Sequence, residues 1–414
     1  MERFKYGIDE IKLIKLCSDL IKIDSQNPPG DTRSIINFIS EYLASHNIKS
    51  TTFEASPYRT GLIASIGSET GPELILSGHA DTVPIGDPTN WKLDALSGDI
   101  VDNFLYGRGA SDMKAGLGGL IYTLVHIKSL GVKLSGKLTL VVIPDEETGS
   151  KHGAQYLLEN KLIGGDAAII AEPTGRNNPG IGQKGSAGFK LKIMGIPAHS
   201  ALSPLAGRSA ILDAFTAINS IKELVSKEIP YPEDLEKLVI QSKEYLVETG
   251  YPELADIITL VSFNAGKIIG GTASNVVPEY CEVDFDLRTP LGITRDEVLD
   301  MIESKLNTLG INYEMTRKVF KADANYTSED SKIVRQLYKS IEEIITESPK
   351  GIIQYAASDS RFFRKHGIPS VQYGPGEIET IHGLDERVSV SNIIECTKVY
   401  LLTSIQYLNN KNEL

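Results

Sequence analysis

The chain of 414 residues is poor in cysteine and has no long apolar run. Its three cysteines, Cys17, Cys281 and Cys396, are odd in number and widely spaced, so we expect neither a disulfide framework nor a cysteine metal site. No apolar run approaches the roughly 20 residues that span a bilayer. The first nine residues are charged and do not resemble a signal peptide. We therefore expect a cytoplasmic protein without a membrane partner.

Basic residues are also scarce relative to acidic ones. Lys and Arg number 42 and Asp and Glu number 54, which gives a net charge of -12. Binding to nucleic acid needs a basic face, so we expect no nucleic-acid partner. The hydrophobic content of 41% is ordinary for a globular protein. At about 150 residues per domain, the length predicts two or three domains.

Helical and strand patterns alternate in the first part of the chain. Apolar residues recur every three or four positions in 9–23 and 31–46, which predicts helices there. Lys114–Leu130 is predicted to be a further helix. Short apolar runs predict buried strands at Leu74–Leu76, Leu138–Ile143 and Ala167–Ile170. The alternation predicts an α/β domain with a mostly parallel mixed sheet flanked by helices.

The pattern changes near Ser186. A strand, a helix, two strands, a helix and a last strand then predict a small α+β domain. These elements are expected at Phe189–Ile193, Arg208–Leu224, 257–268, 279–288, Arg295–Leu309 and Asn312–Phe320.

The helix–strand alternation returns after Tyr326, at Ser331–Ile345 and Ile368–Tyr373. We therefore predict a catalytic domain formed by 1–186 and 321–414, with a second domain, 187–320, inserted in it. The polar, acidic stretch Lys227–Pro252 is interpreted as an excursion of the inserted domain or as a mobile loop.

Histidines and carboxylates follow several predicted strands, where open α/β sheets place their ligands. Taken singly, each has a plainer interpretation, such as a polar loop or a helix cap. Taken together, they favour a metal site at the strand ends. Mixed nitrogen and oxygen ligands without thiolates suit zinc, cobalt or manganese. The candidates are His79, Asp112, Glu147, Glu172 and His382.

At this point the sequence resembles the dinuclear-zinc peptidases and deacylases of the M20 type. These include acetylornithine deacetylase, succinyl-diaminopimelate desuccinylase, aminoacylase-1 and glutamate carboxypeptidase. The resemblance covers nearly the whole chain, and its motifs occur in the family's order. They are His-Ala-Asp-Thr-Val-Pro (79–84), Gly-Arg-Gly-Ala-Ser-Asp-Met-Lys (107–114), Asp-Glu-Glu-Thr-Gly (145–149), Glu-Pro-Thr (172–174), Ala-His-Ser (198–200), Gly-Gly-Thr-Ala-Ser-Asn-Val-Val-Pro (270–278), Asp-Leu-Arg-Thr-Pro (286–290) and Ser-Asp-Ser-Arg-Phe-Phe (358–363).

The resemblance implies two divalent metal ions, with zinc expected first and cobalt or manganese as alternatives. One ion would be held by His79, Asp112 and Glu172. The other would be held by Asp112, Glu147 and His382, with Asp112 as the bridge. The resemblance also implies that Glu146 is the general base and acid, and that Asp81 orients His79.

The inserted domain is implied to be a ferredoxin-like lid that also forms a homodimer. Its His199 would reach the partner's active site, with a polar residue beside a helix as the plainer interpretation. Asn275 and Arg288 would bind the substrate's carboxylate. For Arg288 the alternative interpretation is an ion pair on the strand face.

These features imply hydrolysis of an N-acyl amino acid, of the acetylornithine or succinyl-diaminopimelate kind. A carboxypeptidase or dipeptidase that takes a short peptide with a free carboxylate is the second hypothesis, and a metal-free binding protein is the third. Three departures leave the substrate open. Gln183-Lys184 stands where desuccinylases carry two arginines, Ala356-Ala357-Ser358-Asp359 lacks a threonine, and one extra residue precedes Pro204.

Overall fold

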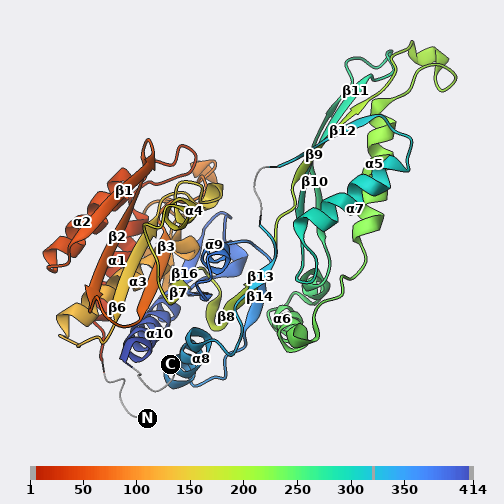
Figure 1. The fold of residues 1–414 in the computed structure, drawn as a ribbon. Helices are drawn as coiled ribbons and strands as arrows, with labels where there is room; N and C mark the ends of the chain where they lie inside the picture. The colour runs from red at the N-terminus through yellow and green to blue at the C-terminus, as the bar shows by residue number, and fades with distance from the viewer. Residues whose placement is uncertain (1–5, 319–321, 410–414) are drawn as a thin grey trace. The chain divides into compact units, whose positions relative to one another are not determined.

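The structure is a computed structural model that describes residues 6–318 and 322–409 (Figure 1). The chain divides into two compact units. The first contains Met1–Ile181, Thr327–Gly351 and Ser358–Leu414, and the second contains Gly182–Tyr326 and Ile352–Ala357. The assignment of 1–186 and 321–414 to a catalytic domain and of 187–320 to a lid stays a prediction. Its boundary after Phe320 lies outside the described residues.

A mixed sheet forms the centre of the first unit, in the order β1-β2-β6-β3-β7-β15-β8. The central strands β6, β3, β7 and β15 pair in parallel, whereas β1, β2 and β8 join antiparallel. The fold class is thus confirmed, with parallel pairing confined to the centre. The strands are β1 (Ser50–Ser56), β2 (Arg59–Gly67), β3 (Glu73–His79), β6 (Lys137–Ile143), β7 (Ala167–Ile170), β8 (Gly175–Gln183) and β15 (Ser370–Gly374).

Helices cover both faces of this sheet. Side chains alternate along β3, so Ile75 packs with α4 and α9 in one cluster, while α3 and α10 pack from the other side. Since both faces are covered, β7 and the middle of β3 are continuous apolar runs. The helices are α1 (Glu10–Ile21), α2 (Arg33–Ser45), α3 (Ala115–Ser129), α4 (Ala154–Glu159), α8 (Lys332–Ile345), α9 (Ser360–Lys365) and α10 (Val390–Asn409). Across 6–318 and 322–409, the helices are too short or too polar to cross a membrane.

A small antiparallel sheet lies beside the main one in the first unit. Its strands β4 (Ile100–Val101), β5 (Phe104–Tyr106) and β16 (Arg387–Ser389) run in the order β16-β5-β4. The pairing of Arg387 with Tyr106 brings the segment after β5 next to the segment before β16. Two parts of the chain that are far apart in sequence therefore meet here.

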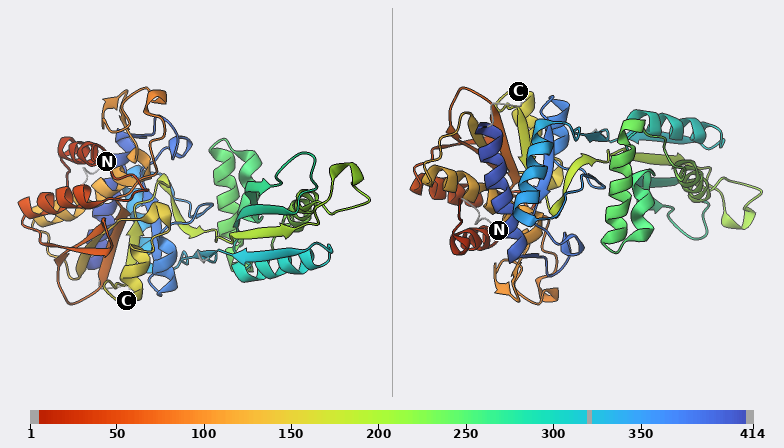
Figure 2. Two further views of the ribbon diagram at one scale, coloured as in Figure 1. Left: turned by 90° about the horizontal axis from the view of Figure 1, so that it is seen from above. Right: turned by 90° about the horizontal axis from the view of Figure 1, so that it is seen from below.

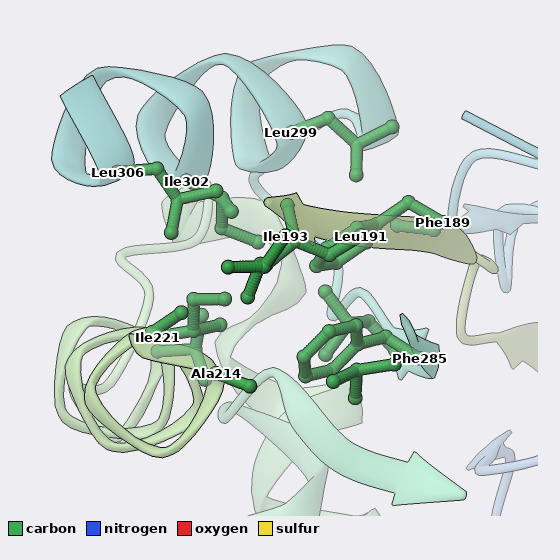
Figure 3. Close-up of a cluster of buried hydrophobic side chains, with 14 of the residues drawn as sticks. Phe189, Leu191, Ile193, Ala214, Ile221, Phe285, Leu299, Ile302 and Leu306 are labelled. Atoms are coloured by element: carbon green, nitrogen blue, oxygen red, sulfur yellow. The ribbon is translucent and has the colours of Figure 1, made fainter. Parts of the chain in front are cut away.

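The second unit contains a four-stranded antiparallel sheet in the order β10-β11-β9-β12. The helix α5, which follows its first strand, and the helix α7, which follows its third, pack on this sheet, and this is the ferredoxin-like topology that the resemblance implied. Alternate side chains of β9 and β11 face a core shared with α5 and α7 (Figure 3). The elements are β9 (Phe189–Met194), α5 (Ala210–Val225), β10 (Ser262–Gly270), β11 (Tyr280–Arg288), α7 (Arg295–Asn307) and β12 (Tyr313–Arg317).

The stretch Lys227–Pro252 contains a helix, α6 (Glu236–Glu248), so the loop interpretation is wrong there (Figure 2). Leu238, Ser242 and Tyr245 are buried at helical spacing, and the polar positions between them hide this pattern in the sequence. Two short strands, β13 (Asn325–Tyr326) and β14 (Ile352–Gln354), pair with β8, and β13 lies opposite its last two residues, Gly182 and Gln183.

One strand prediction needs correction at its start. Residues 257 and 258 belong to the short helix η6 (Pro252–Ile258), and β10 begins at Ser262. The predicted last strand is present as β12, and its predicted end at Phe320 lies outside the described residues.

Candidate metal centre

His79 is the last residue of β3, and its imidazole is buried. The ring Nδ1 lies 2.9 Å from the main-chain oxygen of Asp81, so it carries the proton that this bond requires. The Nε2 atom then offers its lone pair to a ligand. The carboxylate of Asp81 is 3.6 Å from Nδ1, so the main-chain oxygen of Asp81 is the nearer partner of this nitrogen.

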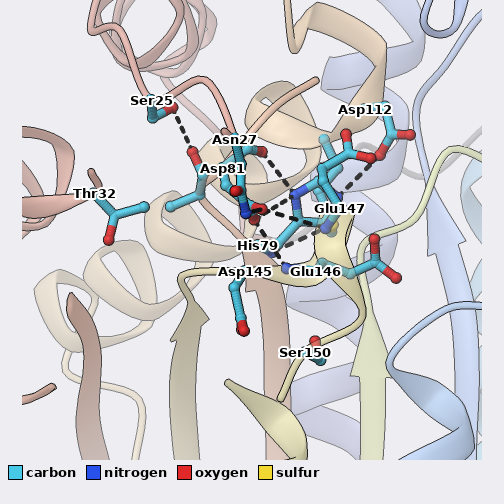
Figure 4. A network of polar contacts seen from close by, with 12 residues as sticks. Ser25, Asn27, Thr32, His79, Asp81, Asp112, Asp145, Glu146, Glu147 and Ser150 are labelled. Atoms are coloured by element: carbon cyan, nitrogen blue, oxygen red, sulfur yellow. Dashed lines mark hydrogen bonds and ion pairs between the residues drawn. The ribbon is translucent and has the colours of Figure 1, made fainter. Parts of the chain in front are cut away.

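Asp81 uses its carboxylate to hold a turn. One oxygen accepts a hydrogen bond from the backbone N–H of Glu146 at 3.1 Å. The other accepts from the backbone N–H of Glu147 at 3.2 Å and from the side chain of Asn27 at 2.9 Å (Figure 4). Asp81 therefore fixes the short helix η3 (Glu146–Thr148) against the end of β3.

Asp112 lies between the two histidines. Its Oδ1 is 3.0 Å from Nε2 of His79, and its Oδ2 is 3.2 Å from Nε2 of His382. The helix α3 begins at Ala115 with Lys114 at its N-cap position, so Asp112 does not cap this helix. Asp112 sits instead in the turn η2 (Ala110–Lys114), in an extended conformation that points its carboxylate at both imidazoles.

The predicted ligands converge in two overlapping groups. Ligand atoms of His79, Asp112 and Glu172 lie within 4.8 Å of one another, and so do those of Asp112, Glu147 and His382. Glu172 follows β7, Glu147 follows β6 and His382 follows β15, so the carboxyl ends of the parallel strands bring them together. Among the described residues, Glu146 stands outside both groups although it neighbours Glu147.

The pKa values of these groups show that the cluster requires positive charge. Burial and the nearby Asp112 raise the pKa of Glu172 to about 8, and burial also raises the pKa of Glu147. Hydrogen bonds to Asp112 and Glu147 raise the pKa of His382 to about 10. Carboxylates packed this closely need positive charge among them. Nitrogen and oxygen donors around two adjacent points therefore fit two divalent cations.

Glu146 occupies different surroundings from Glu147. Its carboxylate lies 3.8 Å from the guanidinium of Arg361, which is itself buried. Burial, together with Glu172 and Asp359, raises the pKa of Glu146 well above its ordinary value. A carboxyl group with increased proton affinity beside a metal centre can take up and release a proton.

The remaining predicted residues belong to the second unit. His199 is exposed, and its Nδ1 accepts a hydrogen bond from the backbone N–H of Ala201, as expected of a polar residue at the start of η4 (Ser200–Leu202). Asn275 is also exposed and lies beside His199, since the main-chain oxygen of Asn275 accepts a hydrogen bond from the backbone N–H of Ser200 at 3.0 Å. Arg288 ends β11 and pairs with Asp286 at 3.1 Å, which matches the alternative ion-pair interpretation.

Two further buried residues, Arg108 and Glu386, lie next to the cluster and were not predicted from the sequence. Glu386 accepts hydrogen bonds from the backbone of Ser111 and Asp112, and Arg108 forms an ion pair with it at 2.6 Å. Arg108 belongs to a motif already noted, and Glu386 follows His382 by four positions. Glu386 binds main-chain atoms and an arginine that are far away in sequence, so the residue pattern gives no signal of these contacts.

The chain is similar to known proteins over almost its whole length. The chain is 26% identical over 411 residues to a probable succinyl-diaminopimelate desuccinylase of Staphylococcus aureus, covering 97% of this chain and 99% of the relative. Its fold resembles an M20 family metallo-carboxypeptidase from Sulfolobus solfataricus, with a TM-score of 0.79 and 20% identity over 97% and 99% of the two chains. It also resembles a tripeptidase from Staphylococcus aureus, with a TM-score of 0.76 and 22% identity over 97% and 100%.

Residues 75–406 match the family described as Peptidase family M20/M25/M40. The match includes every residue of the two ligand groups and the neighbouring Glu146. The resemblance drawn from the motifs is thereby confirmed, and this chain is a metallohydrolase that belongs to Peptidase family M20/M25/M40.

Proposed function

We propose that this enzyme hydrolyses the amide bond of an N-acyl amino acid with the help of two divalent metal ions. The observation that carries the proposal is the placement of Asp112 between His79 and His382, with Glu146 beside the cluster but outside both ligand groups. The desuccinylase name of the Staphylococcus aureus relative supports an acyl substrate.

His79, Asp112 and Glu172 would hold one ion, and Asp112, Glu147 and His382 the other. The donor set favours zinc, with cobalt and manganese as alternatives. When bound, the two ions polarise the scissile carbonyl and lower the pKa of the attacking water. The backbone of η3 is held by Asp81, which would keep Glu147 in place as a metal ligand and Glu146 next to the ligands.

Glu146 accepts the proton of the attacking water and returns it to the leaving nitrogen. Its raised pKa suits this exchange, because the carboxyl can hold the proton between the two steps. His199 would donate a hydrogen bond to the developing oxyanion. Asn275 and Arg288 would bind the substrate's carboxylate. Arg288 would break its ion pair with Asp286 to do so.

A panel of N-acetyl and N-succinyl amino acids, assayed with zinc, cobalt and manganese in parallel, tests the proposal. We expect release of the free amino acid from at least one acyl class, loss of activity with a chelator and recovery when metal is restored. Dipeptides assayed beside them serve as the comparison. An enzyme that contains metal but is inactive on the whole acyl panel would contradict the proposal.

The second candidate is a carboxypeptidase or dipeptidase. The carboxypeptidase and tripeptidase names of the two solved structures favour it, and the chemistry at the amide would be the same. Release of amino acids from dipeptides, with no deacylation, would select this alternative. The third hypothesis, a metal-free binding protein, is set aside because the chain is a metallohydrolase of this family.

A further inference from the structure

Glu386 is a fully buried carboxylate in the segment between η7 (Ile378–Thr380) and β16. Its Oε1 accepts hydrogen bonds from two consecutive backbone N–H groups, those of Ser111 and Asp112, each at 3.0 Å. Its Oε2 accepts from the guanidinium of Arg108 at 2.6 Å. Arg108 is also buried, so this is an ion pair with little access to water.

Further bonds join the same two segments. The backbone N–H of Gly107 donates to the main-chain oxygen of Glu386 at 2.9 Å. The hydroxyl of Ser111 donates to the oxygen of Arg387 at 2.7 Å. Arg108 also approaches the main-chain oxygen of His382 at 3.5 Å. The turn that carries Asp112 and the segment that carries His382 therefore form one hydrogen-bonded body with Glu386 at its centre.

These hydrogen bonds determine the direction in which the carboxylate of Asp112 points. Two N–H groups that converge on one oxygen fix the backbone on the N-terminal side of Asp112, and hence the direction in which its side chain leaves the chain. Glu386 is four residues from His382, so the same contact sets the spacing between Asp112 and His382. Outer partners of this kind commonly change metal affinity by about 10- to 100-fold when they are removed.

We propose that Glu386 is a positioning residue that holds Asp112 and His382 at the spacing a two-metal centre requires. The role rests on the proposed function, since it concerns the metal ions of that same site. Glutamine cannot replace it. Its amide NH₂ would face either Arg108 or the two backbone N–H groups, and in both cases a donor would meet donors.

The test compares the unmodified enzyme with Glu386→Gln and with the double variant Arg108→Met/Glu386→Gln. The double variant removes the guanidinium, so the glutamine oxygen can accept from the backbone while its NH₂ turns away. Glu379→Gln is the matched control, because it removes one exposed carboxylate from the same part of the chain. Each protein is prepared without metal, checked for folding by circular dichroism and titrated with zinc against a chromogenic chelator.

We expect Glu386→Gln to bind zinc about 10- to 100-fold more weakly than the control, and the double variant to recover part of that loss. Zinc affinity of Glu386→Gln equal to that of the control would overturn the proposal. If neither variant folds, Glu386 serves folding and the proposal is overturned as well. An unmodified enzyme that binds no zinc would contradict the proposed function itself, which separates the two failures.

Discussion

Glu146 and Glu147 are adjacent in the chain but have different chemical surroundings. They lie in the short helix η3, where successive side chains point about 120° apart. Glu147 approaches His382 at 3.3 Å, whereas Glu146 approaches Arg361 at 3.8 Å. The turn that Asp81 holds can therefore supply one carboxylate as a metal ligand and a second carboxylate that accepts and releases a proton.

Replacing Glu146 by alanine should separate these two roles. We expect Glu146→Ala to keep two metal ions per chain and to lower kcat by about a hundred- to ten-thousand-fold, because proton transfer is lost. Metal analysis and steady-state kinetics measure the two effects. Glu41→Ala, which removes an exposed carboxylate from α2, is the control. Activity of Glu146→Ala near that of the control would contradict the role assigned to Glu146.

At the scale of residues, the sequence located the groups that meet at the strand ends. His79, Asp112 and Glu172 converge as expected, because residue types and strand positions carry that information. The contacts that hold them did not follow from the sequence. Asp81 and Glu386 bind main-chain N–H groups, and every residue except proline carries such a group, so no spacing of residue types marks the partner.

At the scale of elements, apolar runs predicted the central strands well, because these strands are buried on both faces. The strand β8 was not predicted. Its sequence, Gly-Arg-Asn-Asn-Pro-Gly-Ile-Gly-Gln, is rich in turn-forming residues that disfavour strands. Its antiparallel pairing with β15 overrides this local preference, and that pairing depends on residues about 190 positions away, such as Gln372 opposite Gly180.

The packing of α3 against the sheet requires a glycine at one position. A Cβ atom on Gly116 would lie 2.4 Å from the main-chain oxygen of Ala171, the residue before Glu172. We expect Gly116→Ala to lower the free energy of unfolding by about 1–3 kcal/mol through overpacking, and to weaken metal binding by displacing Glu172.

Denaturant unfolding and zinc titration measure the two effects of Gly116→Ala. Gly164→Ala is the control, since a Cβ there meets nothing within 4 Å. If Gly116→Ala matches this control in both measurements, the helix and the strand end are not in the close contact described.

At the scale of the whole molecule, the second unit has several large apolar side chains exposed at its surface. Leu212 and Phe215 on α5 are 68% and 65% exposed. The neighbouring strand β10 is the edge of its sheet, and its Ile268 and Ile269 are about half exposed. An apolar helix face beside an open strand edge is typical of a surface that pairs with another chain. We propose that a second copy of this chain covers it.

If a second copy covers this surface, charges placed on it should separate the two copies. We expect Leu212→Asp/Phe215→Asp to be monomeric by light scattering and to lose activity, while Leu162→Asp, at an exposed site in the first unit, stays dimeric.

If His199 acts across the dimer, mixing inactive Glu146→Ala with inactive His199→Ala should restore activity, because a mixed dimer contains one intact site. A fully active monomer, or a mixture without activity, would contradict a role for His199 in the partner's site.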